Sequence, residues 1–294
     1  MGLRDAAIVA YAETKVMEES DRDIFELDGD ILETLLDKTG VEKAEIDGLV
    51  MSGLTRTGAG NVFWAQQTAE ELGLDVSWCD QVHVGGCSAT GAVARAAAAI
   101  DAGHCNVAFL LFADTTSEDN RKDRGFRAEW ADPYGLMGPP ASFGLLARRY
   151  EHQYGLDYSM LGKLAVTQRN HALLNDMACE KLRKPITIED YLKSRMIAAP
   201  IRLLDCVMPC DGATGLLMMS RERAKQKGLH KQVVPLGYAE RTNYGGGEPM
   251  MDITWTGHKD AGQRAMKAAG LAVKDVASFH PYDDFRSEEH TSEL

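Results

Sequence analysis

Short apolar runs alternate with helix-patterned segments in the first part of the chain. The runs at 6–11, 49–51 and 107–112 have the length and composition of buried strands. Residues 21–39 carry apolar side chains at helical spacing, and Gly40 follows as a stop. Strands that alternate with helices favour a largely parallel α/β sheet.

The strongest helix prediction falls on an alanine-rich segment. Residues 87–100 are rich in alanine, the best helix former, and are apolar on nearly every side, so we expect a buried helix. A shorter helix is predicted at 63–72. Between these two helices, residues 78–84 read as a strand that runs into Gly85-Gly86. His83 on that strand is expected to be a core histidine or a support for a nearby site.

Residues 115–194 break this alternation. They are richer in charge, aromatic residues and proline, and helices are predicted near 143–154 and 160–174. We interpret this part of the chain as an inserted cap.

The alternation resumes after the cap. Strands are expected at 203–211 and 216–220, with a tight turn at Asp211-Gly212-Ala213 between them. A helix at 262–269 and a strand at 276–280 follow.

Two stretches near the start of the chain recur near its end in the same order. Tyr11-Ala12-Glu13 and Tyr238-Ala239-Glu240 each follow an apolar run, and residues 38–49 resemble residues 268–279. A repeat of such a long period indicates two similar half-domains and not a solenoid. A site between two such halves needs both of them.

Composition and charge describe an ordinary acidic globular protein. Apolar residues make up 45% and charged residues 26%, and the net charge of −12 argues against a nucleic-acid partner. The six cysteines contain no C-x-x-C pair, so neither a metal site nor a disulfide framework is predicted. There is no signal peptide and no apolar run long enough for a membrane span. We therefore expect a cytoplasmic protein.

The last nine residues call for separate treatment. Residues 286–294 match the translation of a widely used short-read library adapter, codon for codon, and we interpret them as an adapter-derived tail. The alternative is an ordinary polar tail. We exclude this segment from the fold prediction.

The first candidate for chemistry is the tetrapeptide Gly85-Gly86-Cys87-Ser88 at the start of the buried helix. The helix dipole and unpaired N–H groups favour a thiolate at Cys87, and the same N–H groups at Gly85, Gly86 and Ser88 could hold an oxyanion. Cys87 is thus a candidate nucleophile for acyl transfer. The alternative is a small thiol that merely packs well. Neither a serine-hydrolase elbow nor a phosphate loop fits the spacing.

The second candidate is His280-Pro281-Tyr282-Asp283, directly after a predicted strand. Strand ends are where α/β proteins place their sites, and Tyr282 could donate or accept a proton beside the carboxylate of Asp283. The alternative is a polar turn.

Together these motifs resemble the thiolase superfamily, in the branch of sterol-carrier-protein-type thiolases and lipid-transfer-like acyl-CoA enzymes. The resemblance also rests on Arg202-Leu203-Leu204-Asp205-Cys206 and Asp211-Gly212-Ala213. It implies a layered αβαβα fold of two duplicated halves, the second incomplete. The implied parts are an N-terminal half (1–118 and 195–230), an inserted loop domain (119–194), a truncated C-terminal half (231–285) and the tail (286–294).

The sequence departs from the thiolase pattern at two places. A gap-free count back from Ala102-Gly103 puts the nucleophile register on Gly86, and a one-residue shift puts it on Cys87. Tyr282 stands where thiolases carry a histidine. A tyrosine there resembles the retro-aldolases of β-hydroxyacyl-CoA steroid side chains, which pair with a small zinc-ribbon/OB-fold protein.

The resemblance implies carbon–carbon bond chemistry on coenzyme A thioesters, with no bound cofactor or metal. The main prediction is thiolase-like acyl transfer through Cys87. The alternatives are a retro-aldol reaction that uses Tyr282, or an acyl-CoA or lipid-binding protein without catalysis. A homodimer is implied, and this chain alone is expected to be inactive.

Overall fold

The computed structural model describes residues 3–52, 63–116, 132–136, 138–241 and 257–281. The chain divides into two compact units. Unit 1 consists of Met1–Ser117, Cys210–Glu240 and Asp260–Phe279, and unit 2 consists of Glu118–Pro209, Arg241–Lys259 and His280–Leu294. The proposed tail at 286–294 lies outside the described residues.

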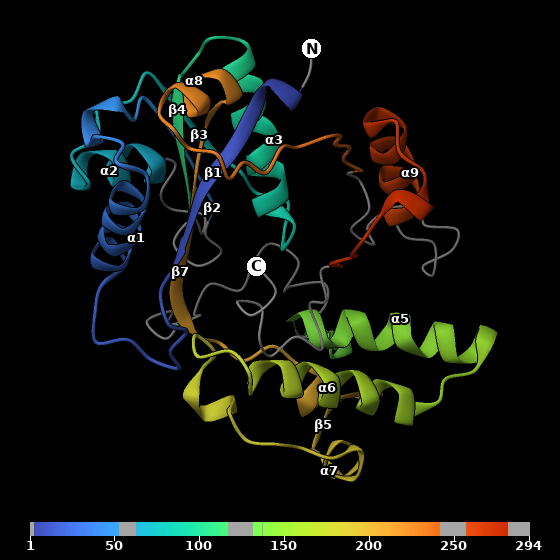
Figure 1. The fold of residues 1–294 in the computed structure, drawn as a ribbon. Coiled ribbons are helices and arrows are strands. Elements are labelled where there is room, and N and C mark those ends of the chain that lie inside the picture. Colours follow the sequence, from blue (N-terminus) through green and yellow to red (C-terminus); the bar gives the residue numbers. More distant parts are fainter. Residues whose placement is uncertain (1–2, 53–62, 117–131, 137, 242–256, 282–294) are drawn as a thin grey trace. The chain divides into compact units, whose positions relative to one another are not determined.

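Unit 1 is built on a five-stranded sheet with the order β1-β7-β4-β2-β3 (Figure 1). The strands are β1 (Ala6–Glu13), β2 (Gly48–Ser52), β3 (Trp78–Gln81), β4 (Val107–Thr115) and β7 (Asp211–Ser220). β2 pairs parallel with β3 and β4, whereas β7 pairs antiparallel with β1 and β4. The sheet is therefore mixed, and the prediction of a largely parallel sheet was wrong for its β1-β7-β4 side.

The direction of β7 follows from where the chain re-enters the sheet. Thr115 at the end of β4 pairs with Asp211 at the start of β7. The chain thus leaves and returns at the same end of the sheet, so β7 has to run back along β4. The expected turn at 211–213 is part of this continuous strand, and residues 203–205 form a 3-10 helix.

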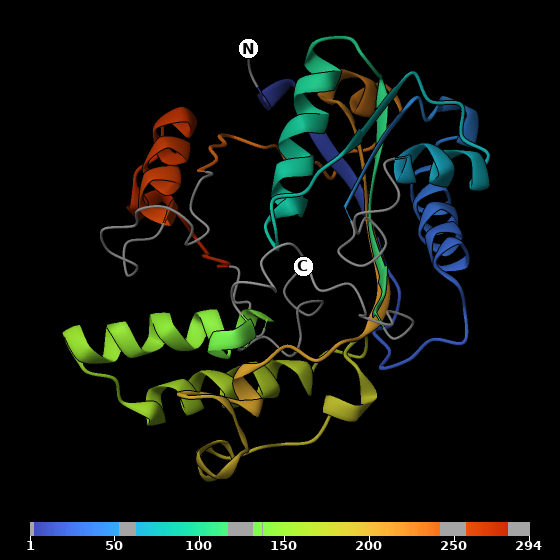
Figure 2. The same ribbon diagram turned by 180° about the vertical axis from the view of Figure 1, so that it is seen from behind.

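Helices cover both faces of this sheet, as the views in Figures 1 and 2 show. α1 (Ile24–Thr39) and α2 (Trp64–Glu71) pack on one face against Leu49 and Met51 of β2. α3 (Ser88–Asp101) packs on the other face against Val50 of the same strand. Because successive strand residues point to opposite faces, the fully buried β2 contributes to two cores.

The predicted helices are confirmed, with small shifts at their ends. α1 begins at Ile24 because Asp23 and Glu26 form a capping box, and it ends at Gly40 with φ of 64°. α3 has the expected alanine-rich buried surface. α9 (Gly257–Ala269) ends at Gly270 with φ of 71°.

The two repeated stretches share local geometry. In each, a helix ends at a left-handed glycine (Gly40, Gly270) and a 3-10 turn follows three residues later. The predicted strand at 276–280 is not formed, and these residues are exposed. The apolar run at 233–237 that precedes Tyr238 forms no strand, only one bridge between Val233 and Ile8. A duplicated fold therefore stays a prediction.

Unit 2 contains the two helices expected in the cap. They are α5 (Gly138–Tyr154) and α6 (Tyr158–Ala172), and they are followed by α7 (Ile188–Lys193) and the hairpin of β5 (Met196–Ala198) and β6 (Ile201–Arg202). Tyr191 is fully buried, and its hydroxyl donates to the buried carboxylate of Asp205 at 3.0 Å. The amide of Arg202 also donates to Asp205, at 2.8 Å. This network ties α7 to the segment that returns to unit 1.

No helix among the residues that the structure describes has both the length and the apolar character needed to cross a bilayer.

We predict that Gly215→Ala destabilises the protein. A Cβ at this position of β7 collides with Cγ2 of Ile31 and lies 3.1 Å from the carbonyl oxygen of Leu110. Overpacking of this kind costs about 1–3 kcal/mol, which chemical denaturation can measure. The control is Gly262→Ala in α9, where a Cβ meets nothing within 4 Å. That change is expected to be neutral or to stabilise by up to about 1 kcal/mol. Equal effects of the two substitutions contradict the proposed packing.

A second prediction concerns pH and Glu45. Its carboxylate accepts from Lys227 at 2.7 Å and Arg223 at 2.9 Å, and Lys227 is the main cause that lowers the Glu45 pKa from 4.5 to about 2. An acid whose pKa is lowered by folding contributes stability above its unfolded pKa and loses it as the pH falls through the folded value.

Glu45→Gln is therefore expected to cost about 1 kcal/mol at pH 7, because the pair is partly exposed to solvent. The difference from the unmodified protein should shrink between about pH 5 and pH 2. Unfolding free energies at several pH values check this. Glu33→Gln, on an exposed residue of α1, is the control that should leave stability unchanged at each pH. A difference that stays constant with pH contradicts the assignment.

Candidate active site

The glycine turn before α3 lies at the carboxyl ends of the parallel strands. Met51 of β2 pairs with Gln81, the last residue of β3, and the chain reaches Gly85 four residues later. Gly85 has φ of 71°, a left-handed conformation that glycine adopts without strain. Cys87 is then the N-cap of α3. The strand expected at 78–84 ends at Gln81.

Ser88 locks this turn through its hydroxyl group. Its Oγ donates to the carbonyl of Gly85 at 2.6 Å and accepts from the amide of Val84 at 3.0 Å. The residue is only 4% exposed. Both hydrogen-bonding functions of the hydroxyl are thus used within the turn, which fixes the path of residues 84–88.

Cys87 is exposed, whereas the other five cysteines are buried or half-buried. Its Sγ donates to the carbonyl of Val84 at 3.1 Å. Burial raises the pKa of Cys79 to about 11 and that of Cys105 to about 12. Cys87 is the thiol that a substrate could reach.

His83 is not a core histidine, the first of the two roles expected for it. It is exposed, and its Nε2 lies 3.2 Å from the side-chain nitrogen of Gln81. The reason is that β3 has ended two residues earlier, so His83 belongs to the loop and not to a strand that faces the core.

The remaining predicted site residues divide into two groups. Gly86 lies one residue before the N-cap and forms a bridge with Val84, so it belongs to the same turn as Cys87. Tyr282 and Asp283 lie outside the described residues.

A polar network around α3 was not predicted from the sequence. Arg95 on α3 donates to both carboxylate oxygens of Glu240, at 3.1 and 3.2 Å, and to the carbonyl of Gly91 at 3.1 Å. Burial raises the pKa of the Tyr238 phenol, which also bonds to Arg95 and Glu240. Tyr238 packs so closely on α3 that a Cβ at Gly91 would lie 3.2 Å from its hydroxyl oxygen.

One signal for this network was present in the sequence. The repeated tripeptide places its tyrosine and glutamate on one face of an extended segment, two residues apart. Tyr11 and Glu13 in the first copy also share a hydrogen bond, as Tyr238 and Glu240 do. The repeat could not show that an arginine of α3, Arg95, binds the glutamate of the second copy, Glu240.

This arrangement can stabilise an oxyanion more readily than it can bind a metal. The N–H groups of Ala89 and Thr90 in the first turn of α3 have no partner within the helix, whereas the N–H of Ser88 already donates to the carbonyl of Gly85 at 3.0 Å. Within the described ranges, no three His, Cys, Asp or Glu side chains gather into a cluster that could hold a metal ion.

Comparison with protein families gives a match to the thiolase N-terminal domain over residues 6–198. The match covers all strands of the sheet except β7, and it includes the turn at Cys87.

Two curated relatives are an aldolase and a lyase. A steroid side-chain-cleaving aldolase from Thermomonospora curvata is 29% identical over 95% of this chain and 74% of its own length. A 17-hydroxy-3-oxo-4-pregnene-20-carboxyl-CoA lyase from Mycobacterium tuberculosis is 32% identical over 75% of this chain. The matched region spans 58% of the lyase.

A solved structure described as the Ltp2-ChsH2(DUF35) aldolase has a TM-score of 0.84 and 28% identity, over 97% of this chain and 75% of that chain. The α/β fold, the glycine turn at the start of α3 and these relatives all indicate the same family. The chain belongs to the thiolase superfamily, in the branch of sterol-carrier-protein-type thiolases and lipid-transfer proteins that has steroid side-chain aldolases among its members.

Proposed function

We propose that this chain is part of an aldolase that cleaves a carbon–carbon bond in a β-hydroxyacyl-CoA thioester of the steroid side-chain type. The observation that carries the proposal is the similarity to a steroid side-chain-cleaving aldolase over 95% of the chain. This order reverses the sequence-based ranking, in which thiolase-like acyl transfer came first. Aldol cleavage and acyl transfer are both acyl-CoA reactions within the thiolase superfamily.

A retro-aldol reaction needs a base, a site for an enolate and a proton donor. The base removes the proton of the β-hydroxyl group, the bond between the α and β carbons breaks, and the β carbon becomes a carbonyl. The electron pair of the broken bond passes to the α carbon, where the thioester carbonyl delocalises it as an enolate. A proton then returns to the α carbon. The reaction needs no redox cofactor.

The residues of this chain can be assigned to these tasks. We assign the base to Tyr282, with Asp283 beside it as the group that tunes its proton affinity. We assign the enolate oxygen to N–H groups of the turn from Gly85 to Cys87, because the N–H of Ser88 already donates to the carbonyl of Gly85 at 3.0 Å. That turn is suited to the task because Ser88 fixes it from behind and leaves it exposed at Gly86 and Cys87.

Thiolysis through Cys87 is the second candidate, and the exposure of this thiol favours it. The hydrogen bond from Sγ to the Val84 carbonyl counts against it, because a nucleophilic thiolate has to give up that donor role. Acyl-CoA or lipid binding without catalysis is the third candidate.

We predict that Tyr282→Phe lowers aldol cleavage by about 10²–10⁴-fold, the usual contribution of a general base. Cys87→Ser should change it by less than about threefold, because a serine hydroxyl can still donate to the Val84 carbonyl. Release of the carbonyl product from a β-hydroxyacyl-CoA steroid, followed chromatographically, is the measurement. The assay is made on this chain and on a version extended through the rest of its natural gene.

The outcomes separate the three candidates. Loss of β-ketoacyl-CoA thiolysis in Cys87→Ser, with Tyr282→Phe unaffected, supports the thiolase reading. Saturable acyl-CoA binding without turnover in the extended protein supports the binding protein. Turnover that neither substitution changes contradicts both catalytic assignments.

We further propose a protein partner and a cytoplasmic location. The aldolase of known structure is described as a complex with a DUF35 protein, and the sequence predicted a small zinc-ribbon/OB-fold partner. The homodimer and the two duplicated halves, with their boundaries, also stay proposals.

Co-expression with a DUF35-type protein is expected to yield a stable complex. Light scattering after size exclusion should give a mass that exceeds the mass of the extended protein alone by at least one partner mass. Without the partner, the extended protein should elute as a dimer. A DUF35 protein that elutes separately contradicts the partner assignment, and a monomeric extended protein contradicts the dimer.

A further inference from the structure

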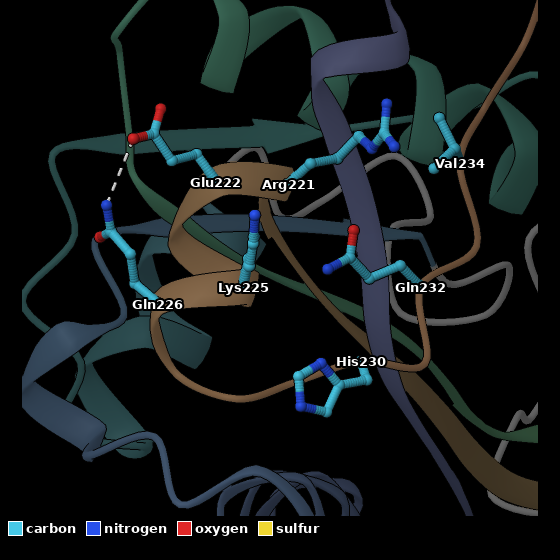
Figure 3. A pocket seen from close by; sticks show the side chains of 7 residues that line it. All are labelled: Arg221, Glu222, Lys225, Gln226, His230, Gln232 and Val234. Carbon is cyan, nitrogen blue, oxygen red and sulfur yellow. Dashed lines mark hydrogen bonds between the residues drawn. The ribbon is translucent and has the colours of Figure 1, made fainter.

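An open pocket lies beside α8 (Arg221–Gln226), the short helix that follows β7 in unit 1. It has a volume of about 960 Å³. Figure 3 shows side chains from α8 on one side and from the segment after it on the other. The lining residues are Arg221, Glu222, Lys225, Gln226, His230, Gln232 and Val234.

The pocket concentrates positive charge in a chain whose net charge is −12. Two cations, Arg221 and Lys225, line it, and Glu222 is the one carboxylate among the described residues around it. The carboxylate of Glu222 accepts from the Gln226 amide at 3.3 Å, at the edge of the group in Figure 3. Among these lining side chains, cations therefore outnumber carboxylates two to one.

The cationic side chains on the two sides of α8 have different surroundings. Arg223 and Lys227 point to Glu45 and bind its carboxylate. Arg221 and Lys225 have the same four-residue spacing but line the pocket instead. Like charges at this spacing repel one another on a helix by a few tenths of a kcal/mol. An anion held between them removes that cost.

The pocket lies at the end of the sheet opposite the glycine turn. α8 begins directly after Ser220, which pairs with Ala6 at the start of β1, and Met219 pairs with Val107 at the start of β4. Cys87 follows the carboxyl ends of the parallel strands. A ligand in this pocket is therefore separate from a substrate at the glycine turn.

We propose that this pocket binds a phosphate-bearing small molecule of about nucleotide size. A phosphate group offers three oxygens to cations that approach from different sides, and arginine and lysine are the side chains that recognise it. The carboxamide of Gln232 adds a neutral donor or acceptor for the rest of the ligand. The pocket is open to solvent, and its volume has room for more than a lone phosphate ion.

Isothermal titration calorimetry with inorganic phosphate, pyrophosphate and adenosine 3′,5′-bisphosphate tests the proposal. We expect saturable binding, and we expect Arg221→Gln together with Lys225→Gln to weaken it at least about tenfold, because each loses a charged hydrogen bond. The matched control is Lys227→Gln, which removes the same charge from the face of α8 that binds Glu45. It should weaken binding by less than about threefold.

The outcomes also identify the source of the phosphate. Tighter binding of the bisphosphate than of inorganic phosphate indicates a nucleotide-like ligand, and equal binding indicates that the phosphate group alone is recognised. Equal weakening by the double substitution and by Lys227→Gln overturns the proposal, as does the absence of saturable binding for all three probes. Binding is measured without turnover, so the result is independent of the proposed aldol reaction.

Discussion

Unit 1 depends on the antiparallel pairing of β7 with both β1 and β4. This strand comes from a distant part of the sequence, yet it occupies an interior position of the sheet. Without it, β1 has no partner in the sheet, and the core between α1 and the sheet lacks Leu217 and Met219. Its backbone approaches α1 so closely that Gly215 has room for no side chain. The strands that carry the glycine turn are thus held by residues that follow the whole of the cap.

The elements that could be predicted from sequence are those whose local pattern and tertiary position agree. The alanine-rich α3 was predictable because alanine favours a helix and also fits a buried site. β7 was misjudged at Asp211-Gly212 because both residue types favour turns. In the fold, the Asp211 carboxylate accepts from the amide of Ser20 at 2.8 Å, so a distant contact overrides the local preference.

The candidate site also combines features that could be predicted from the sequence with features that could not. Residue types placed Cys87 and its glycines at the start of a helix, and the structure confirms that position. They could not show that the thiol donates to Val84 or that Ser88 spends its hydroxyl on the turn, because both depend on the backbone path. The contact of Arg95 with Glu240 joins residues 145 positions apart, which no local pattern encodes. The hydrogen bond of Cys87 and the similarity to a steroid side-chain-cleaving aldolase together favour the proposed aldol cleavage over thiolysis.

The pairing of β7 also has a consequence for synthesis on the ribosome. Thr115 ends β4, and Ser220 ends the strand that pairs with it, 105 residues later. At about 5–20 residues per second, β4 waits roughly 5–20 s with an open edge before its neighbour emerges. During that interval the nascent chain presents an unpaired apolar strand, the kind of surface that chaperones bind and that pairs wrongly with other chains. The cap between the two strands thus sets a delay during which the half-made sheet has to be protected.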